Sequence, residues 1–216
     1  DPDHIVVVAG HGADAVRDTT AEYAPDAQVV LLEEQLGTGH AVAQAKAVLG
    51  NYDGDILVLY GDTPFISDQT IADIATARAN ADLVVLGFHA ADPGRYGRLV
   101  TDGDALEKIV EYKDASEDER TITLCNSGVM AARASDMFDW IDATGNDNAS
   151  GEYYLTDCVE IARARGKTAS GVICDEAETL GVKSRSQLTQ AEAAFHTRAR
   201  ADAMGRRGRH GSEGGG

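Results

Sequence analysis

The sequence is poor in cysteine, in aromatic residues and in positive charge. Its 216 residues include three cysteines and no Cys-x-x-Cys pair, so it predicts neither a disulfide framework nor a zinc site. Lys and Arg number 19 against 36 Asp and Glu, a formal charge of −17 that repels polyanions and anionic membranes. We therefore expect no nucleic-acid partner and no membrane partner. Cys125, Cys158 and Cys174 are expected to be small buried residues.

Long apolar runs are also missing. None reaches the ~18 residues that span a bilayer. The first residues, DPDHIVVVAGHGADA, lack the basic start and apolar stretch of a signal peptide, so we expect a cytoplasmic protein. The chain starts with Asp and enters a strand-like run at Ile5, which suggests a fragment. We expect one domain over 1–204 and a disordered, Gly-rich and basic tail over 205–216.

Short apolar runs, at 5–8, 28–32, 55–60 and 82–88, alternate with Ala-rich segments of helical length. Runs that are apolar throughout are typical of strands buried on both faces, which predicts an α/β fold with a mixed, mostly parallel sheet. Turn signals at 93–94 and 102–103 predict a β-hairpin insertion with strands at 98–101 and 106–111. Further strands are expected at 123–131 and 168–174, and helices near 135–144, 152–165 and 186–204.

Two glycine-rich turns are candidate ligand loops. The first, Gly10-x-Gly12, follows a strand, and a second strand ends at Glu33, an arrangement typical of dinucleotide-binding units. The same turn is common in any α/β protein. The second, at 37–39, precedes a helical pattern that Thr38 is expected to cap. His40 in that first turn is expected to be a packing residue.

The residue with the clearest chemical setting is Asp62, just after a buried strand, where open α/β sheets place their ligands. There it can serve as a Mg²⁺ ligand or a ribose anchor. It can equally be a turn residue that caps the helix expected to begin near Ser67. Mg²⁺ prefers hard oxygen ligands and keeps several waters, so one carboxylate plus substrate phosphates can hold it.

Taken together, these residues resemble the uridyltransferase domain of bacterial N-acetylglucosamine-1-phosphate uridyltransferase, a domain joined in that family to glucosamine-1-phosphate acetyltransferase. The resemblance runs from Ile5 to about Met204. It rests on seven ordered motifs, which are EEQLGTGHAVAQA, LYGDTPFI, YGRLV, IVEYKDAS, CNSGVM, NDNASGEYYLTD and GVKSRSQL.

This resemblance implies a Rossmann-like nucleotidyltransferase that uses Mg²⁺ to convert UTP and N-acetylglucosamine 1-phosphate into UDP-N-acetylglucosamine and pyrophosphate. The product would feed peptidoglycan and lipopolysaccharide synthesis. No protein nucleophile is needed, because the sugar phosphate itself attacks the α-phosphorus. The implied contacts are Gly37 and Thr38 to uracil, Tyr60 and Gly61 to the nucleotide, Asp62 to Mg²⁺, and Gly97, Glu111, Asn126, Glu152, Tyr154 and Thr156 to the amino sugar.

The chain departs from the family pattern in several places. The family's first strand, phosphate loop and lysine have no counterpart, so we expect a gap between the runs at 5–8 and 55–60, and weak or no activity. Leu32 replaces a uracil-contacting Gln, which predicts weaker uridine selectivity. The family's β-helix, which carries the acetyltransferase and the trimer, is also absent, so neither is expected of this chain.

Lys183 occupies the position of the family's second metal ligand, an Asn. An ammonium ~4 Å from a divalent ion is repelled by about 8 kcal/mol at an effective dielectric of 20. Lys183 is therefore expected to point away from the metal or to contact the phosphates. Two other readings stay open from the residues: an NAD-type oxidoreductase using Gly10, Gly12 and Glu33, and a non-catalytic nucleotide-sugar binder.

Overall fold

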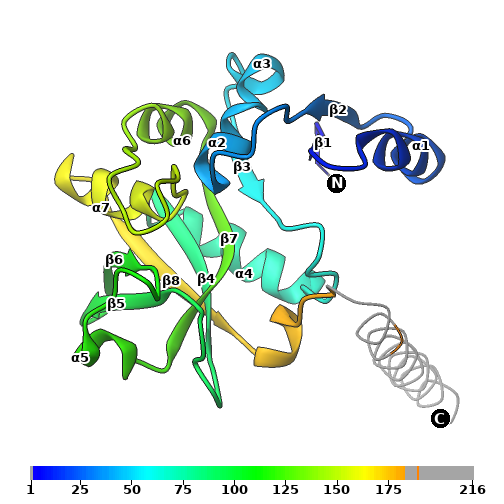
Figure 1. The fold of residues 1–216 in the computed structure, drawn as a ribbon. Helices are drawn as coiled ribbons and strands as arrows, with labels where there is room; N and C mark the ends of the chain where they lie inside the picture. Colours follow the sequence, from blue (N-terminus) through cyan, green and yellow to red (C-terminus); the bar gives the residue numbers. More distant parts are fainter. Residues whose placement is uncertain (1, 183–188, 190–216) are drawn as a thin grey trace, which may run out of the picture.

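A computed structural model describes residues 2–182 and 189, which form two sheets with helices packed around them (Figure 1). The small sheet pairs β1 (Val6–Ala9) in parallel with β2 (Gln28–Leu31), and α1 (Ala13–Tyr23) connects them. The large sheet has the order β3-β7-β4-β8-β6-β5. Its strands are β3 (Asp55–Val58), β4 (Leu83–His89), β5 (Arg98–Asp102), β6 (Ala105–Val110), β7 (Leu124–Arg133) and β8 (Ala169–Cys174).

The helices lie between these strands, as the alternating pattern predicts. They are α2 (Thr38–Ala43), α3 (Lys46–Leu49), α4 (Asp68–Arg78), α5 (Glu117–Arg120), α6 (Ala134–Ile141), α7 (Asp157–Ala164) and the 3-10 turn η1 (Glu176–Thr179). None of the described helices is long and apolar enough to cross a membrane. The helix expected at 186–204 and the tail at 205–216 lie outside the described residues.

The sheet is mixed, but parallel pairings are fewer than expected. β4 pairs in parallel with β8, whereas β7 runs antiparallel between β3 and β4. β3, β4, β5 and β8 therefore share one direction, and β6 and β7 run the opposite way. An apolar run shows that a strand is buried but not which way it runs, so the expectation of a mostly parallel sheet is corrected to a mostly antiparallel set of pairings.

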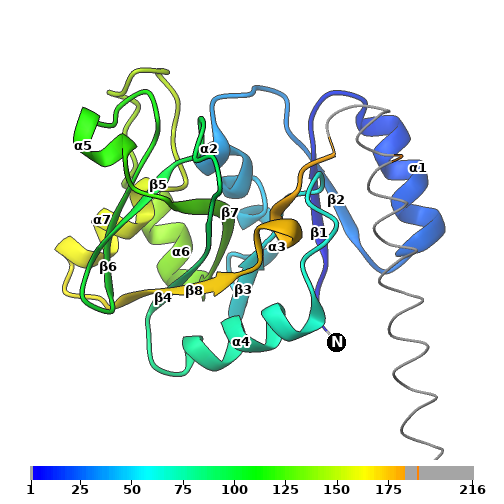
Figure 2. The same cartoon turned by 90° about the horizontal axis from the view of Figure 1, so that it is seen from below.

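Burial on both faces explains why β4 is apolar throughout. Leu83 and Val85 belong to one core cluster, whereas Val84 and Leu86 belong to another on the opposite face. α4 covers the second face along β4 and β8, and α6 and α7 pack on the first (Figure 2). Cys125 and Cys158 are buried as expected, while Cys174 is partly exposed.

The cap of α4 excludes one of the two interpretations of Asp62. The Ser67 hydroxyl accepts a hydrogen bond from the Thr70 amide at 3.1 Å, so Ser67 caps α4 and Asp62 does not. The expected helix at 152–165 starts later, at Asp157, and the residues just before it form a turn, in which the Asp157 amide donates to the Tyr154 carbonyl at 3.3 Å. The predicted hairpin is confirmed, with Gly103 in its turn at φ 57°.

The expected gap between β1 and β3 is present. Among the described residues, β1 pairs with β2 alone and β3 with β7 alone, so each keeps one unpaired edge. Tyr52, just before β3, contacts the His4 ring edge-on at 5.4 Å and donates a hydrogen bond to Asp3 at 3.0 Å. Side chains of both strands pack against the same core cluster. The small sheet is therefore held to the large one by side chains and not by strand pairing.

Candidate active site

Gly37 brings α2 against the segment before α7. Its φ of 117° is favoured only by glycine, and a Cβ there would lie 2.5 Å from the Tyr153 carbonyl oxygen. The Gly39 amide donates to that same oxygen at 2.8 Å, and the Tyr153 amide donates to the Leu36 carbonyl at 2.8 Å. The two backbones therefore run in direct contact, and only glycine fits at position 37.

Thr38 has a different role from the expected one. It is the first residue of α2, Gly37 is the N-cap, and no side chain caps this helix. The Thr38 hydroxyl instead accepts a hydrogen bond from the Leu155 amide at 3.0 Å and hydrogen-bonds the Tyr60 side chain. Burial raises the pKa of the Tyr60 phenol, and nearby Glu111 and Asp62 act in the same direction. Thr38 and Tyr60, far apart in the sequence, are thus brought together.

Tyr60 connects this group to β7. Its ring lies directly over Gly128, where a Cβ would come within 2.5 Å of the ring and φ is 91°. The Gly128 amide donates to the Asn126 side-chain oxygen at 2.9 Å. This bond fixes the amide plane of Asn126 and directs its NH₂ group away from the Gly128 amide.

The predicted sugar contacts form a second group beside the first. Glu111 accepts a hydrogen bond from the Thr156 hydroxyl at 3.2 Å, and burial raises the pKa of this carboxyl. A Cβ at Gly97 would meet both carboxylate oxygens of Glu111 at 3.4 Å. Glycine at 97 therefore leaves the space in front of the carboxylate open. The Gly97 carbonyl accepts from the Asn126 amide at 2.9 Å, which joins this group to β7.

Asp62 lies at the end of the segment that follows β3, and its carbonyl accepts a hydrogen bond from the Val182 amide at 2.7 Å. Glu178 ties the segment before Val182 to the start of α4. Its Oε2 accepts hydrogen bonds from the Ser67 amide at 2.7 Å and from the Thr70 hydroxyl at 2.8 Å. Lys183, the residue after Val182, lies outside the described residues. Within the described part of the chain, no three His, Cys, Asp or Glu side chains gather around a possible metal position.

An acidic groove of about 350 Å³ adjoins the Glu111 group. Burial raises the pKa of Tyr154, which lines it, and a hydrogen bond from Ser150 opposes the shift. Glu152 lies in the loop before it, and its charge also raises the Tyr154 pKa. A neighbouring hollow of about 410 Å³ shares Lys108 and Glu160 with the groove and contains none of the predicted site residues. Its other lining residues are Glu107, Arg163 and Ala164. The groove is lined by Lys108, Ile109, Val110, Glu111, Asp114, Gly145, Asp147, Asn148, Tyr154, Asp157 and Glu160.

Asp157 in this groove predicts a pH-dependent stability. Burial raises its pKa to about 6, and Glu160, Glu111 and Asp114 act in the same direction. The unfolded state then releases this proton at lower pH than the folded state does. Stability from this group is therefore present below about pH 4 and is lost as the pH rises to about 6. Asp157→Asn should remove this loss and stabilise the protein by on the order of 1 kcal/mol at pH 7, after allowance for solvent screening.

The measurement is urea unfolding of wild type and variant at several pH values between 4 and 8. The matched control is Asp104→Asn, because Asp104 is exposed on the turn between β5 and β6. A stability difference for Asp157→Asn that does not change with pH, or that matches the Asp104→Asn value throughout, would contradict the prediction.

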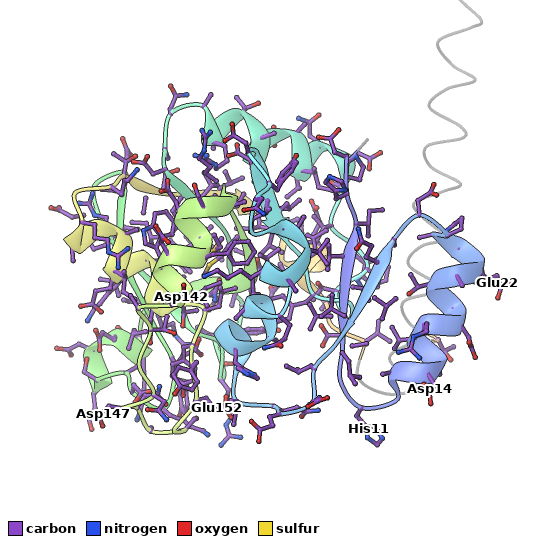
Figure 3. The ribbon with its side chains drawn as sticks, turned by 90° about the horizontal axis from the view of Figure 1, so that it is seen from above. His11, Asp14, Glu22, Asp142, Asp147 and Glu152 are labelled. Carbon is purple, nitrogen blue, oxygen red and sulfur yellow. The ribbon has the colours of Figure 1, made fainter. Side chains whose placement is uncertain are left out.

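The Gly10 turn has the strand, turn and helix of a dinucleotide site, with Gly12 at the N-cap of α1 at φ 75°. A Cβ at Gly10 would meet the Gln35 side chain at 3.2 Å, so that side chain lies over the turn. His11 marks this end of the molecule in Figure 3, and Glu152 lies on the other side of α2. The structure therefore does not bring the Gly10 turn together with the Glu111 group.

Sequence reasoning missed three residues that shape this site. Tyr153 contributes its backbone to the contact with Gly37, and no side-chain pattern reveals such a role. Asp157 begins α7 within the predicted helix, but its place in the groove is not evident from that pattern, although the acidic residues around Glu111 could have indicated it. Arg98 of the YGR motif is buried, which its position between Gly97 and Leu99 does not predict. The remaining predicted residue, Gly61, is exposed next to Tyr60, and a Cβ there would have no neighbour within 4 Å.

Comparison with known proteins places these features among their relatives. The chain is 62% identical over 204 residues to the bifunctional protein GlmU of Ruegeria sp. strain TM1040, covering 94% of this chain and 45% of that protein. It thus spans about half the length of the curated relatives it matches. No family model matches the chain.

Solved structures confirm the fold. The nucleoside-diphosphate-sugar pyrophosphorylase of Vibrio cholerae RC9 superposes with a TM-score of 0.65 at 14% identity, over 86% of this chain and 78% of that one. A UDP-glucose pyrophosphorylase complexed with UDP-glucose gives 0.62 at 15% identity, over 89% and 80%. The resemblance drawn from the motifs is thereby confirmed: the chain is a part-length relative of the bifunctional GlmU proteins, and it has the Rossmann-like fold of the sugar-nucleotide pyrophosphorylases.

Proposed function

We propose that this chain carries the nucleotidyltransferase site that forms UDP-N-acetylglucosamine and pyrophosphate from UTP and N-acetylglucosamine 1-phosphate. The observation that carries the proposal is the meeting of two groups. The Thr38 hydroxyl and Tyr60 lie beside the Glu111 carboxylate, which Gly97 leaves open. One group suits a nucleotide and the other a sugar. The 62% identity to a GlmU protein supports the same assignment.

In the proposed reaction, a phosphate oxygen of the sugar phosphate attacks the α-phosphorus of UTP. A new O–P bond forms as the bond to the β-phosphate bridging oxygen breaks, and pyrophosphate leaves. The chain's contribution is orientation. Gly37 and Thr38 would hold the uracil, and Tyr60 with Gly61 would line the nucleotide. Glu111 would accept from a sugar hydroxyl, and the Asn126 NH₂ would donate to the sugar, because its oxygen already accepts from Gly128.

Glu152, Tyr154 and Thr156 would complete the wall of the sugar pocket. Thr156 donates its hydroxyl to Glu111 and so orients the carboxylate for the ligand. Tyr154 and Glu152 would close the side toward the acidic groove. The Leu32 side chain cannot hydrogen-bond a base edge, so we expect weak discrimination between uracil and cytosine nucleotides.

Mg²⁺ fits this arrangement as a phosphate-bound ion. Asp62 would hold the ion, and one carboxylate is enough because Mg²⁺ commonly binds through one or two carboxylates with phosphates and water. When bound, the ion would neutralise phosphate charge. The field at the site is otherwise negative, since both Asp62 and Glu111 raise the pKa of Tyr60. A nucleotide would therefore bind poorly without the cation.

The test is calorimetric titration of the chain with UDP-N-acetylglucosamine, with and without Mg²⁺, and with NADH as the competing ligand. We expect Mg²⁺ to strengthen UDP-N-acetylglucosamine binding by about tenfold or more. Asp62→Asn should abolish that gain, because the attraction between a carboxylate and a cation at contact distance is worth several kcal/mol. Asp104→Asn is the matched control and should keep the gain.

Binding of NADH in preference would overturn the proposal and favour the Gly10 turn. Binding without release of pyrophosphate from UTP and the sugar phosphate would make the chain a nucleotide-sugar binder. If the proposal holds, the protein is a cytoplasmic enzyme that supplies a precursor of peptidoglycan and lipopolysaccharide.

A further inference from the structure

Arg98 on β5 is a buried arginine without an acidic partner. Only 1% of the residue is exposed. Its Nη1 donates to the Tyr96 carbonyl, and its Nη2 donates to the carbonyls of Gly94 at 3.1 Å and Arg120 at 3.3 Å. None of the ion pairs within the described residues includes it. Burying a charge against carbonyls alone costs stability, so a compensating role is expected.

The guanidinium lies on the face of the hairpin opposite the sugar group. Arg98 pairs with Val110 across β5 and β6, and neighbouring residues along a strand point to opposite faces. Gly97 and Glu111 face each other on the other side, where a Cβ at Gly97 would meet the carboxylate at 3.4 Å. Arg98 therefore does not reach the space in front of Glu111.

Arg98 joins the two chain segments that flank the space in front of Glu111. Through Gly94 and Tyr96 it holds the turn that delivers Gly97. Through Arg120 it holds the segment that follows Glu111.

The ring of Tyr112, the residue after Glu111, lies 5.9 Å from the Arg98 guanidinium and 4.7 Å from that of Arg120. The Arg120 Nε also donates to the Tyr112 carbonyl at 3.3 Å. Arg98 thus holds the turn before Gly97 directly, and it holds the segment after Glu111 through Arg120.

We propose that Arg98 is a positioning residue that sets the spacing between Gly97 and Glu111 and thereby the selectivity for the amino sugar half of the ligand. The proposal rests on the function proposed above. The planar guanidinium serves three carbonyls in a fixed geometry, which a lysine ammonium cannot reproduce. Binding of the nucleotide half of the ligand should not depend on Arg98, because Thr38 is held by the Leu155 amide and not by the Arg98 guanidinium.

The experiment compares affinities for UDP-N-acetylglucosamine and for UMP in the presence of Mg²⁺. Arg98→Lys keeps the charge and Arg98→Met keeps much of the length. Both should weaken UDP-N-acetylglucosamine binding by about tenfold while UMP binding stays within about twofold. Arg133→Lys, in an exposed ion pair with Asp53, is the matched control and should change neither affinity.

If either Arg98 variant fails to fold, Arg120→Gln provides a second test, because it removes the hydrogen bond from the exposed Arg120 side chain to the Tyr112 carbonyl. It should weaken UDP-N-acetylglucosamine binding relative to UMP binding by about twofold to fivefold. Equal losses for both ligands, or an unchanged ratio in folded variants, would overturn the positioning role and leave the proposed function intact. A wild-type protein that binds neither ligand would instead overturn the proposed function, and this inference with it.

Discussion

Replacing Gly37 with alanine is expected to destabilise the protein by on the order of 3–5 kcal/mol. Two costs add at this position. The φ of 117° with ψ of 174° is a conformation that essentially only glycine adopts, and the new Cβ would lie 2.5 Å from the Tyr153 carbonyl oxygen. Neither backbone can move alone, because Gly39 and Leu36 are hydrogen-bonded to Tyr153. Urea unfolding at pH 7 measures the loss.

Two further glycines separate these costs. Gly145→Ala should be nearly neutral, since nothing lies within 4 Å of a Cβ there and its φ is ordinary. Gly103→Ala, at φ 57° with open space, should cost about 1 kcal/mol from backbone strain alone. A Gly37→Ala protein no less stable than Gly103→Ala would show that α2 does not press on the segment before α7. Ligand affinity should fall together with stability in Gly37→Ala.

The second large effect is expected for Trp140→Ala, at about 3–5 kcal/mol. Trp140 is 1% exposed on α6 and belongs to the core cluster that also contains Leu155. Truncation would leave a cavity too enclosed to collapse fully. Since proteins are stable by only about 5–15 kcal/mol, this loss would remove much of the total.

The measurement is denaturant unfolding followed by circular dichroism, because Trp140 is the single tryptophan of the chain and its fluorescence disappears with it. Trp140→Phe should cost less, because it refills most of the volume. Tyr23→Ala is the control: Tyr23 is 77% exposed at the end of α1 and should change stability by less than about 0.5 kcal/mol. A Trp140→Ala loss as small as that of Tyr23→Ala would mean that α6 is not part of the core.

Much of the fold was predictable because burial leaves a pattern in the residues. The run at 82–88 predicted β4 since both of its faces are covered, and the glycine at 103 predicted the hairpin turn. Strand direction was not predictable. β7 is buried over 129–132 much as β4 is, yet it runs the other way because it pairs antiparallel with β3 and β4, which depends on residues far away in the sequence.

The candidate site was predictable from motifs and not from spacing. The motifs indicated Thr38, Tyr60 and Glu111, and the structure brings them together. The bond of Thr38 to the Leu155 amide was not foreseen, because Thr before a helical pattern is typical of an N-cap. Arg98 was missed for a related reason: charged residues are expected at the surface, and only the fold shows that three carbonyls converge on this one.

The unpaired edges of β1 and β3 also bear on how the protein behaves at high concentration. In the part of the chain that the structure describes, no strand pairs with the second edge of β1 (Val6–Ala9) or of β3 (Asp55–Val58). Such edges act as templates for strands of other molecules, and neither strand carries the lysine or proline that blunts exposed edges in many sheets. The two sheets are joined by side chains such as Tyr52 and not by strand pairing. This separation therefore favours intermolecular β-aggregation at high protein concentration.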